Sequence, residues 1–162
     1  MSPVAAGDLR RVAGRFPTGV TVVTATAAGR PCGLTVSSFT SVSLEPPLVL
    51  VCIARTARAY ACFEAAQKFA VNVLADDQEA VARLFASLSE DKFRGLAYRP
   101  SPAGHPLLEG VHAWLDCETA ARYEAGTHTV YLARVTDLGA GSGRPLLFYR
   151  SAYARLGGVA PR

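Results

Sequence analysis

The chain has 162 residues, of which 50% are hydrophobic and 19% are charged, and its net charge is +4. This length and composition predict a single folded domain over residues 1–162 and exclude an intrinsically disordered chain. No apolar run has the length of a membrane span, no secretion signal is visible and no basic run stands out. We therefore expect a cytoplasmic protein with no membrane partner and no nucleic-acid partner.

The N-terminal part of the chain predicts one helix followed by a β-hairpin. Residues 8–16 favour a helix with its apolar side chains on one face, and Pro17 ends it. Residues 19–26 alternate as a strand does, with Val22 and Val23 on opposite faces. After a turn, residues 33–44 are predicted to form the return strand of an antiparallel pair.

The middle of the chain predicts two buried strands and two helices. The apolar run at residues 48–53 favours a strand buried on both faces. Residues 56–67 favour a helix, and residues 69–74 favour another buried strand. Residues 76–87 carry the clearest helical pattern, with Asp76 as the predicted N-cap. The apolar face of this last helix is predicted to consist of Val81, Leu84, Phe85 and Leu88.

The C-terminal part predicts a long loop followed by three strands. Residues 89–106 are irregular, and a loop of this length in a compact domain is often functional. Strands are predicted at residues 110–122, 129–136 and 145–153. Because strands and helices do not alternate regularly, the predicted fold is mostly β with a few helices, in an antiparallel barrel. Neither standard glycine-rich nucleotide loop is present.

The four cysteines lack the spacing of a metal site. Cys52 lies in an apolar run and Cys62 in an alanine-rich one, while Cys32 and Cys117 have no cysteine two or three positions away. The pattern predicts four free thiols in a reducing compartment and no metal ligand.

The stretch Gly33–Ile53 carries an unusual number of small hydroxyls, six of them within nine positions. A strand built only for the core would not carry so many, whereas a strand that meets a polar, flat or phosphorylated ligand could. Exposed strands also carry serine and threonine, and from the residues alone both interpretations stay open. The six hydroxyls belong to Thr35, Ser37, Ser38, Thr40, Ser41 and Ser43.

Several segments form an ordered pattern over most of the chain. They are FPTGVTVVTA (16–25), GLTVSSFTSVSLEPPLVLVCI (33–53), FAVNVLA (69–75), DKF (91–93), and the runs at 104–117, 125–135 and 145–153. The set resembles the short-chain flavin reductase family. The resemblance implies an FMN-binding split barrel, a homodimer, and reduction of free FMN or FAD by NADH or NADPH. It also implies a partner monooxygenase that receives the reduced flavin.

The resemblance implies a flavin site around the hydroxyl-rich stretch. Hydroxyls and amides there would hold the ring edge and the ribityl chain. Thr56 is predicted to cap the following helix, and with Arg58 it would attract a phosphate. Lys92 also suits a phosphate, and Phe93 either stacks on the ligand or fills the core. The full predicted set is Thr35, Val36, Ser37, Ser38, Ser41, Cys52, Ile53, Ala54, Thr56, Arg58, Lys92, Phe93, His128, Tyr149 and Arg150.

His128 is the predicted nicotinamide-positioning residue, and Tyr149 and Arg150 could flank the same ligand. Hydride transfer between two cofactors needs little acid–base help, so no catalytic acid or base is predicted. The family commonly has an acidic residue before this histidine, whereas this chain has Thr127. The sequence leaves open the choices of FMN or FAD, of NADH or NADPH, and of the oxygenase.

Two alternative functions are compatible with parts of the pattern. A non-catalytic flavin-binding module of the same fold would bind flavin without oxidising NADH, and His128 argues mildly against it. A small-barrel nucleic-acid binder would need basic and aromatic side chains interleaved on a strand face. The strands here carry valine, serine and threonine instead. Trp114, on an alternating strand, is predicted to lie in the core or at a dimer interface.

Overall fold

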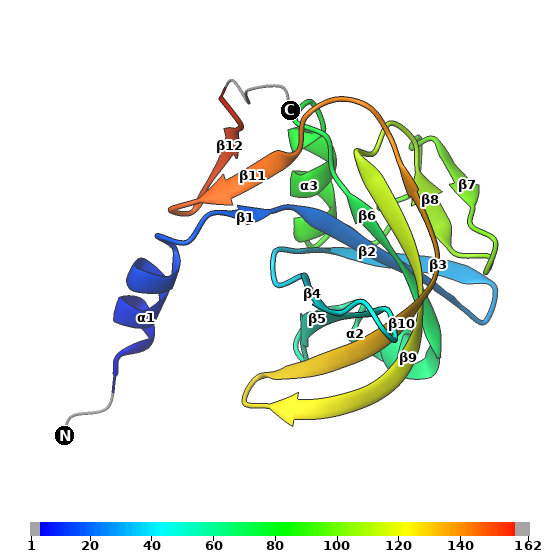
Figure 1. Cartoon of the computed structure of the whole chain (residues 1–162), viewed down its shortest axis with the longest axis horizontal. Coiled ribbons are helices and arrows are strands. Elements are labelled where there is room, and N and C mark those ends of the chain that lie inside the picture. The colour runs from blue at the N-terminus through cyan, green and yellow to red at the C-terminus, as the bar shows by residue number, and fades with distance from the viewer. Residues whose placement is uncertain (1–3, 158–162) are drawn as a thin grey trace.

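Antiparallel strands dominate the computed structural model, which describes residues 4–157 (Figure 1). Its helices are α1 (Ala6–Ala13), α2 (Tyr60–Ala65) and α3 (Glu79–Ala86). Its strands are β1 (Thr18–Gly19), β2 (Thr21–Ala27), β3 (Arg30–Val36), β4 (Thr40–Ser43), β5 (Leu48–Ala54), β6 (Lys68–Val73), β7 (Tyr98–Pro100), β8 (Pro106–Leu108), β9 (Ala113–Ala125), β10 (His128–Ala140), β11 (Leu146–Tyr149) and β12 (Ala152–Arg155).

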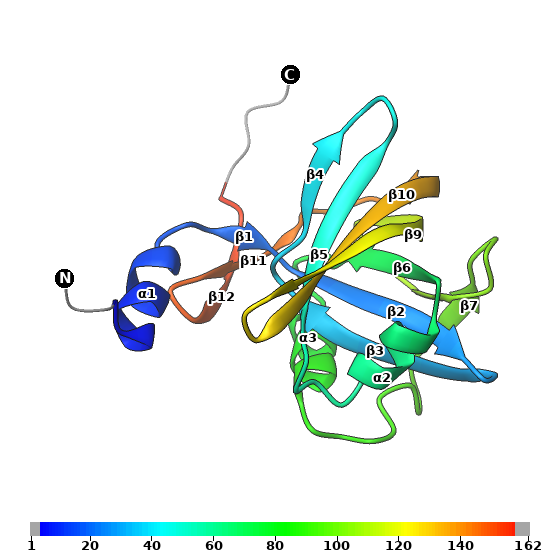
Figure 2. The ribbon, with the colours of Figure 1, turned by 90° about the horizontal axis from the view of Figure 1, so that it is seen from below.

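Seven strands form one antiparallel sheet in the order β3-β2-β6-β9-β10-β5-β4. The sheet curls on itself, so the predicted antiparallel barrel is confirmed (Figures 1 and 2). β1, β11 and β12 form a small second sheet, and β7 pairs with β8. In both views α1 stands apart from the barrel, on the side of β11 and β12.

The barrel has a hydrophobic core on each face of β2. Val23 packs inside the barrel with Phe63, Phe69 and Tyr131. Val22 faces the other way, toward α3 and its buried Phe85. The predicted alternation of β2 is therefore confirmed, and both of its faces are buried because α3 covers the outer one. Burying a side chain such as valine stabilises the fold by about 1.5–3 kcal/mol.

β5 does not follow the prediction that both of its faces are buried. Val49, Val51 and Ile53 are buried in the barrel, whereas the alternate positions from Leu48 to Ala54 are only half-buried. No helix of the described residues covers this outer face, as one covers that of β2, so the apolar run alternates in exposure. Trp114, by contrast, packs against the outer core as predicted, with Arg99 over its ring.

Two predicted strands are each divided by a turn. The hairpin of β2 and β3 is confirmed, but residues 33–44 bend at residues 37–39, and β4 pairs with β5 instead of β2. Residues 145–153 form the hairpin of β11 and β12, whose turn residues Arg150 and Ser151 have positive φ angles of 48° and 64°. The predicted loop 89–106 also contains β7 and the start of β8.

The three helices are shorter than predicted. α2 begins at Tyr60, after Ala59 as its N-cap, so the prediction that Thr56 caps it is wrong. α3 begins after Gln78, and the prediction that Asp76 caps it is also wrong. The turn after β5 occupies the first residues of the helix predicted at 56–67, and the turn after β6 occupies those of the helix predicted at 76–87. Leu88 lies beyond the end of α3 and is exposed, because the helix stops at Ala86.

Two of the four cysteines form a disulfide, so the prediction of four free thiols is wrong for this pair. Cys32 of β3 is bonded to Cys62 of α2, which is 30 residues away in the sequence. Packing of α2 against the β2–β3 hairpin brings the two together, and no local spacing reports such a contact. Cys52 and Cys117 are free, as predicted. Within residues 4–157, the helices lack the length and apolar character that a membrane crossing requires.

Candidate functional site

Three of the predicted site residues line one cavity of about 340 Å³. Arg58 comes from the turn between β5 and α2, and Lys92 and Phe93 come from the loop after α3. Small-molecule sites have volumes of roughly 300–1,000 Å³, so this cavity could hold part of a nucleotide. The cavity is also lined by six residues outside the predicted set: Pro31, Cys32, Gly33, Ala59, Ser89 and Glu90.

The cavity carries two cations held by backbone carbonyls. Lys92 Nζ donates a hydrogen bond to the carbonyl of Phe85 at 2.8 Å, and Arg58 Nη1 donates to the carbonyl of Leu88 at 2.7 Å. Arg58 also lies 3.4 Å from a carboxylate oxygen of Glu90. Burial, and after it the charge of Arg58, lower the pKa of Lys92. Both groups keep further N–H donors, so they can hold an anion.

Phe93 supplies the aromatic wall of the cavity. Its ring makes edge contacts with Phe85 and Tyr98, at centroid distances of 5.2 and 5.3 Å. These contacts fix the ring, and the half-buried side chain still lines the cavity. Two cations beside an aromatic ring fit the chemistry of a phosphorylated aromatic ligand. The DKF segment therefore both packs against the core and faces the cavity.

Gly33 allows the strand wall of this cavity to approach α3. A Cβ atom at this position would lie 2.8 Å from Cε1 of Phe85. Thr35, two residues on, donates its hydroxyl proton to the carbonyl of Ala82 in α3 at 2.6 Å. In the predicted ligand site, Thr35 could therefore offer only its backbone groups and the lone pairs of its hydroxyl oxygen. Val36, next to it, is buried.

Ser38 ties the bend after β3 to β5. Its hydroxyl accepts a hydrogen bond from the amide of Cys52 at 3.0 Å and donates one to the carbonyl of Cys52 at 3.1 Å. Ser38 and Cys52 are therefore neighbours, as a shared site requires. Ser41 is exposed on β4, and Ile53 is buried in the barrel, so only the backbone of Ile53 could meet a ligand.

Ser37 and Arg150 line a second cavity, of about 500 Å³, beside α1. The amide of Arg150 donates to the carbonyl of Gly14 at 2.9 Å, which holds the β11–β12 turn against the end of α1. The guanidinium of Arg150 lies over the ring of Tyr149, 5.2 Å from its centroid. The remaining lining of this cavity, which the sequence prediction missed, consists of Arg10, Ala13, Gly14, Phe16, Thr18, Phe148 and Ser151.

His128 begins β10 and lies opposite Ala54 of β5. Gly126 has a φ of +59°, which suits the tight turn between β9 and β10 that presents the histidine. The hydroxyl of Thr127 lies 2.9 Å from Nδ1 of His128. Threonine thus supplies an orienting partner at the position where the family commonly has an acidic residue. Thr56 is exposed in the turn after Ala54.

Nine of the fifteen predicted residues therefore form four groups instead of lining one cavity, and the other six lie outside these groups. Arg58, Lys92 and Phe93 share the first cavity, and Ser37 and Arg150 share the second. Ser38 meets Cys52, and His128 lies beside Ala54. Five of the thirteen cavity residues that the prediction missed come from β3 and α1, and the other eight come from turns, loops and the strands β1 and β11. The signal that indicated Ser89 and Glu90 was the length of the loop 89–106, which contains them.

The comparisons with known proteins agree on one family. Residues 13–157 match the model of the flavin reductase like domain. The chain belongs to this family.

Among its relatives, a flavin reductase of Pseudomonas putida is 48% identical over 146 residues, which are 89% of this chain and 86% of the relative. The reductase subunit of a flavin-dependent monooxygenase from Mycobacterium tuberculosis is 42% identical over 155 residues, covering 94% of this chain and 81% of the relative. The resemblance stated from the sequence segments is thus confirmed.

The fold comparison points to the same flavin reductase family. An NADH:FAD oxidoreductase of Streptomyces globisporus, solved in complex with NAD and FAD fragments, superposes with a TM-score of 0.91. It is 40% identical in sequence, and the match covers 99% of this chain and 100% of that one. The split-barrel fold of this flavin reductase-like chain is thereby confirmed.

Proposed function

We propose that this chain is an NAD(P)H-dependent flavin reductase that reduces free FMN or FAD and supplies the reduced flavin to a partner monooxygenase. The observation that carries the proposal is the family match over residues 13–157, together with relatives named as reductase components of such oxygenases. The cavity of Arg58, Lys92 and Phe93 supports it, because its donors suit a flavin phosphate. The proposal includes a cytoplasmic location, as predicted from the sequence.

Flavin and nicotinamide supply the hydride chemistry when they are bound, and the chain supplies binding and orientation. Arg58 and Lys92 bind the phosphate through charge-assisted N–H donors. His128, with its ring oriented by Thr127, positions the nicotinamide without serving as an acid or a base. The bend at residues 37–39 presents backbone groups, and the hydroxyl oxygen of Ser38 as an acceptor, to the flavin.

The purified protein is expected to oxidise a reduced nicotinamide only when free flavin is added. The measurement is steady-state loss of absorbance from NADH and NADPH, each with FMN, FAD and riboflavin in turn. Flavin-dependent oxidation with at least one pair supports the reductase. Flavin binding without any oxidation would instead support the alternative, a non-catalytic flavin-binding module.

His128→Ala is expected to raise the KM for NADH roughly fivefold while flavin affinity stays nearly unchanged, since one neutral hydrogen bond is worth about 0.5–1.5 kcal/mol. The variant is compared with Thr127→Val, which keeps the imidazole and removes only its hydroxyl partner, and should show a smaller rise. Normal NADH kinetics with weakened flavin binding would show that His128 belongs to the flavin site and not to the nicotinamide site.

We also propose a homodimer, in which α1 packs against a second copy of the chain. Leu9 and Val12 of α1 are 62% and 56% exposed, and Phe16, which follows the end of the helix, is 75% exposed. A monomer seldom leaves such a group of apolar residues in water. Light scattering at micromolar concentration should give twice the chain mass of 17.1 kDa. A mass equal to a single chain would contradict the dimer.

A further inference from the structure

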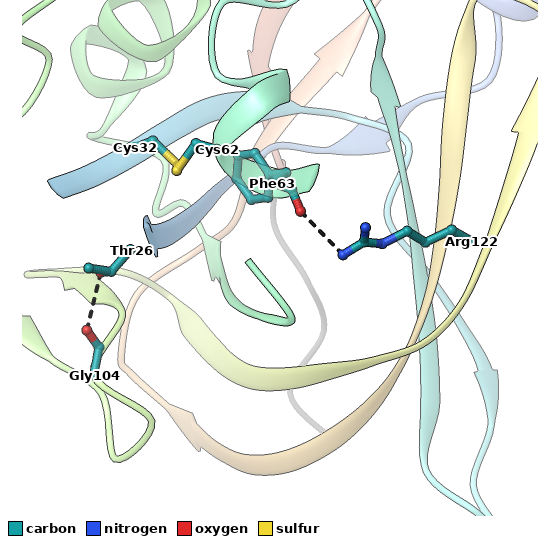
Figure 3. Close-up of a disulfide and its surroundings, with 6 residues drawn as sticks. All are labelled: Thr26, Cys32, Cys62, Phe63, Gly104 and Arg122. Atoms are coloured by element: carbon teal, nitrogen blue, oxygen red, sulfur yellow. Dashed lines mark hydrogen bonds between the residues drawn. A yellow bond between two sulfur atoms is a disulfide. The ribbon is translucent and has the colours of Figure 1, made fainter. Parts of the chain in front are cut away.

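The Cys32–Cys62 disulfide lies in the wall of the cavity that holds Arg58 and Lys92. It joins β3 to α2 (Figure 3). Cys32 and Gly33 line one side of the cavity, and Arg58 and Ala59 line the other. The disulfide therefore joins two of the walls of the cavity. The proposed hydride transfer makes no use of these two sulfur atoms.

α2 is otherwise held from its opposite side, by β9 and β10. Arg122 of β9 donates to the carbonyls of Glu64 and Ala66, at 3.0 and 2.9 Å. Tyr131 of β10 donates to the carboxylate of Glu64 at 2.6 Å. A helix of six residues is not stable alone, so these ties and the buried Phe63 decide where α2 lies. The disulfide is the covalent tie of α2 to β3.

Breaking the disulfide would free one end of the cavity wall. The segment at residues 55–59 connects β5 to α2 and carries Arg58. With the disulfide intact, α2 holds this segment at a set distance from β3. Without it, α2 keeps its non-covalent contacts with β2, β9 and β10 but loses its covalent tie to β3, and the gap between Arg58 and β3 can widen. Arg58 and Lys92 would then bind a phosphate less tightly.

The surroundings of the disulfide suit exchange with external thiols. Cys32 and Cys62 are both half-buried, so a small thiol can reach them. Arg58 and Lys92 line the same cavity, and cationic surroundings favour thiolate chemistry. Of the two free cysteines, Cys52 is also half-buried, whereas Cys117 differs. Cys117 is buried, and burial, followed by the charge of Asp116, raises its pKa to about 12.

We propose that Cys32 and Cys62 form a thiol–disulfide switch that sets the affinity of the neighbouring cavity for flavin nucleotide. The effect on flavin rests on the proposed function, whereas the exchange reaction does not. The oxidised form holds the cavity closed around the phosphate, and the reduced form binds the flavin more weakly. Disulfides in reducing compartments are rare, and those that occur are usually transient and regulatory.

The reductant of the switch is a dithiol. A thiolate of the dithiol attacks one of the two sulfur atoms, the S–S bond breaks, and the other cysteine leaves as a thiolate that takes up a proton. The second thiol of the reductant then displaces the first cysteine and becomes joined in a disulfide. Two electrons and two protons pass to the protein in total. A small disulfide, such as oxidised glutathione, reverses the reaction.

The first test counts thiols and measures backbone exchange, and neither readout depends on activity. Alkylation in denaturant should label two cysteines in protein treated with oxidised glutathione and four after dithiothreitol. Hydrogen–deuterium exchange at residues 55–66 should be roughly tenfold faster in the reduced form, since exchange reports local opening. Four labelled cysteines in both samples, or equal exchange, would overturn the proposal.

The second test measures FMN binding by quenching of flavin fluorescence in both redox forms. Reduction should raise the Kd for FMN by roughly fivefold or more, a typical coupling between two sites. Cys32→Ser/Cys62→Ser is the matched control, and its Kd should equal that of the reduced form with or without dithiothreitol. Equal Kd values in the two forms of the wild type would overturn the switch. If the thiol counts and Kd values are as expected but the protein oxidises no NADH, the proposed function is contradicted and the switch is not.

Discussion

The double variant Arg58→Ala/Lys92→Met is expected to raise the KM for FMN roughly 100-fold at low salt, because hydrogen bonds to charged groups are worth about 1.5–3 kcal/mol each. The lower part of this range applies, since the side chain of Arg58 is 52% exposed and solvent screens its charge. Methionine at position 92 keeps the length of the buried stem, so the change removes mainly the charge.

The controls for this variant separate phosphate binding from folding. Riboflavin lacks the phosphate, so its KM should change little. Arg94→Ala removes an exposed charge from the same loop but not from the cavity lining, and it should leave both KM values unchanged. Thermal unfolding measures the cost of leaving the carbonyl of Phe85 without its Lys92 donor. An equal rise in KM for riboflavin would show that the two cations do not bind the phosphate.

Loss of the Cys32–Cys62 disulfide is expected to lower the free energy of unfolding by about 3–4 kcal/mol. The bond closes a loop between cysteines that are 30 residues apart, and this loop restricts the unfolded chain. For a protein of this size, the loss should lower Tm by roughly 6–16 °C, at about 2–4 °C per kcal/mol. The folded chain keeps the contacts of Phe63 and Arg122 with the barrel, so the reduced protein should still fold.

Urea unfolding with and without dithiothreitol measures this effect. The wild type should shift its midpoint on reduction, and Cys32→Ser/Cys62→Ser should unfold at the lower midpoint in both conditions. A wild-type midpoint that dithiothreitol leaves unchanged would contradict a stabilising disulfide. The comparison also checks that the weaker FMN binding expected of the reduced form is measured on folded protein.

Most of the fold could be predicted from local pattern. The β2–β3 hairpin follows from the alternation at residues 19–26 and the turn after it, and the run at 69–74 became β6. Errors arose where a turn interrupts a continuous pattern. Nothing local in residues 33–44 indicates that Ser38 bonds to Cys52 and that β4 therefore turns away to pair with β5.

Part of the candidate site could also be predicted from the sequence. Arg58, Lys92 and Phe93 were predicted separately and meet in one cavity, because two loops end on the same side of the barrel. The participation of Cys32 and Gly33 was missed. Their position depends on how closely β3 approaches Phe85 of α3, which is a packing distance and not a pattern.

The sequence by itself determined the family, the antiparallel barrel and the residue types that bind an anion, because periodicity and ordered motifs are local properties of a chain. Only the tertiary structure decided that Cys32 meets Cys62 and that Thr35 donates to α3. The exposure of the apolar face of α1 also needed the structure. Each of these depends on the packing of segments far apart in the chain, and the free energy of such packing is not encoded in any one window of residues.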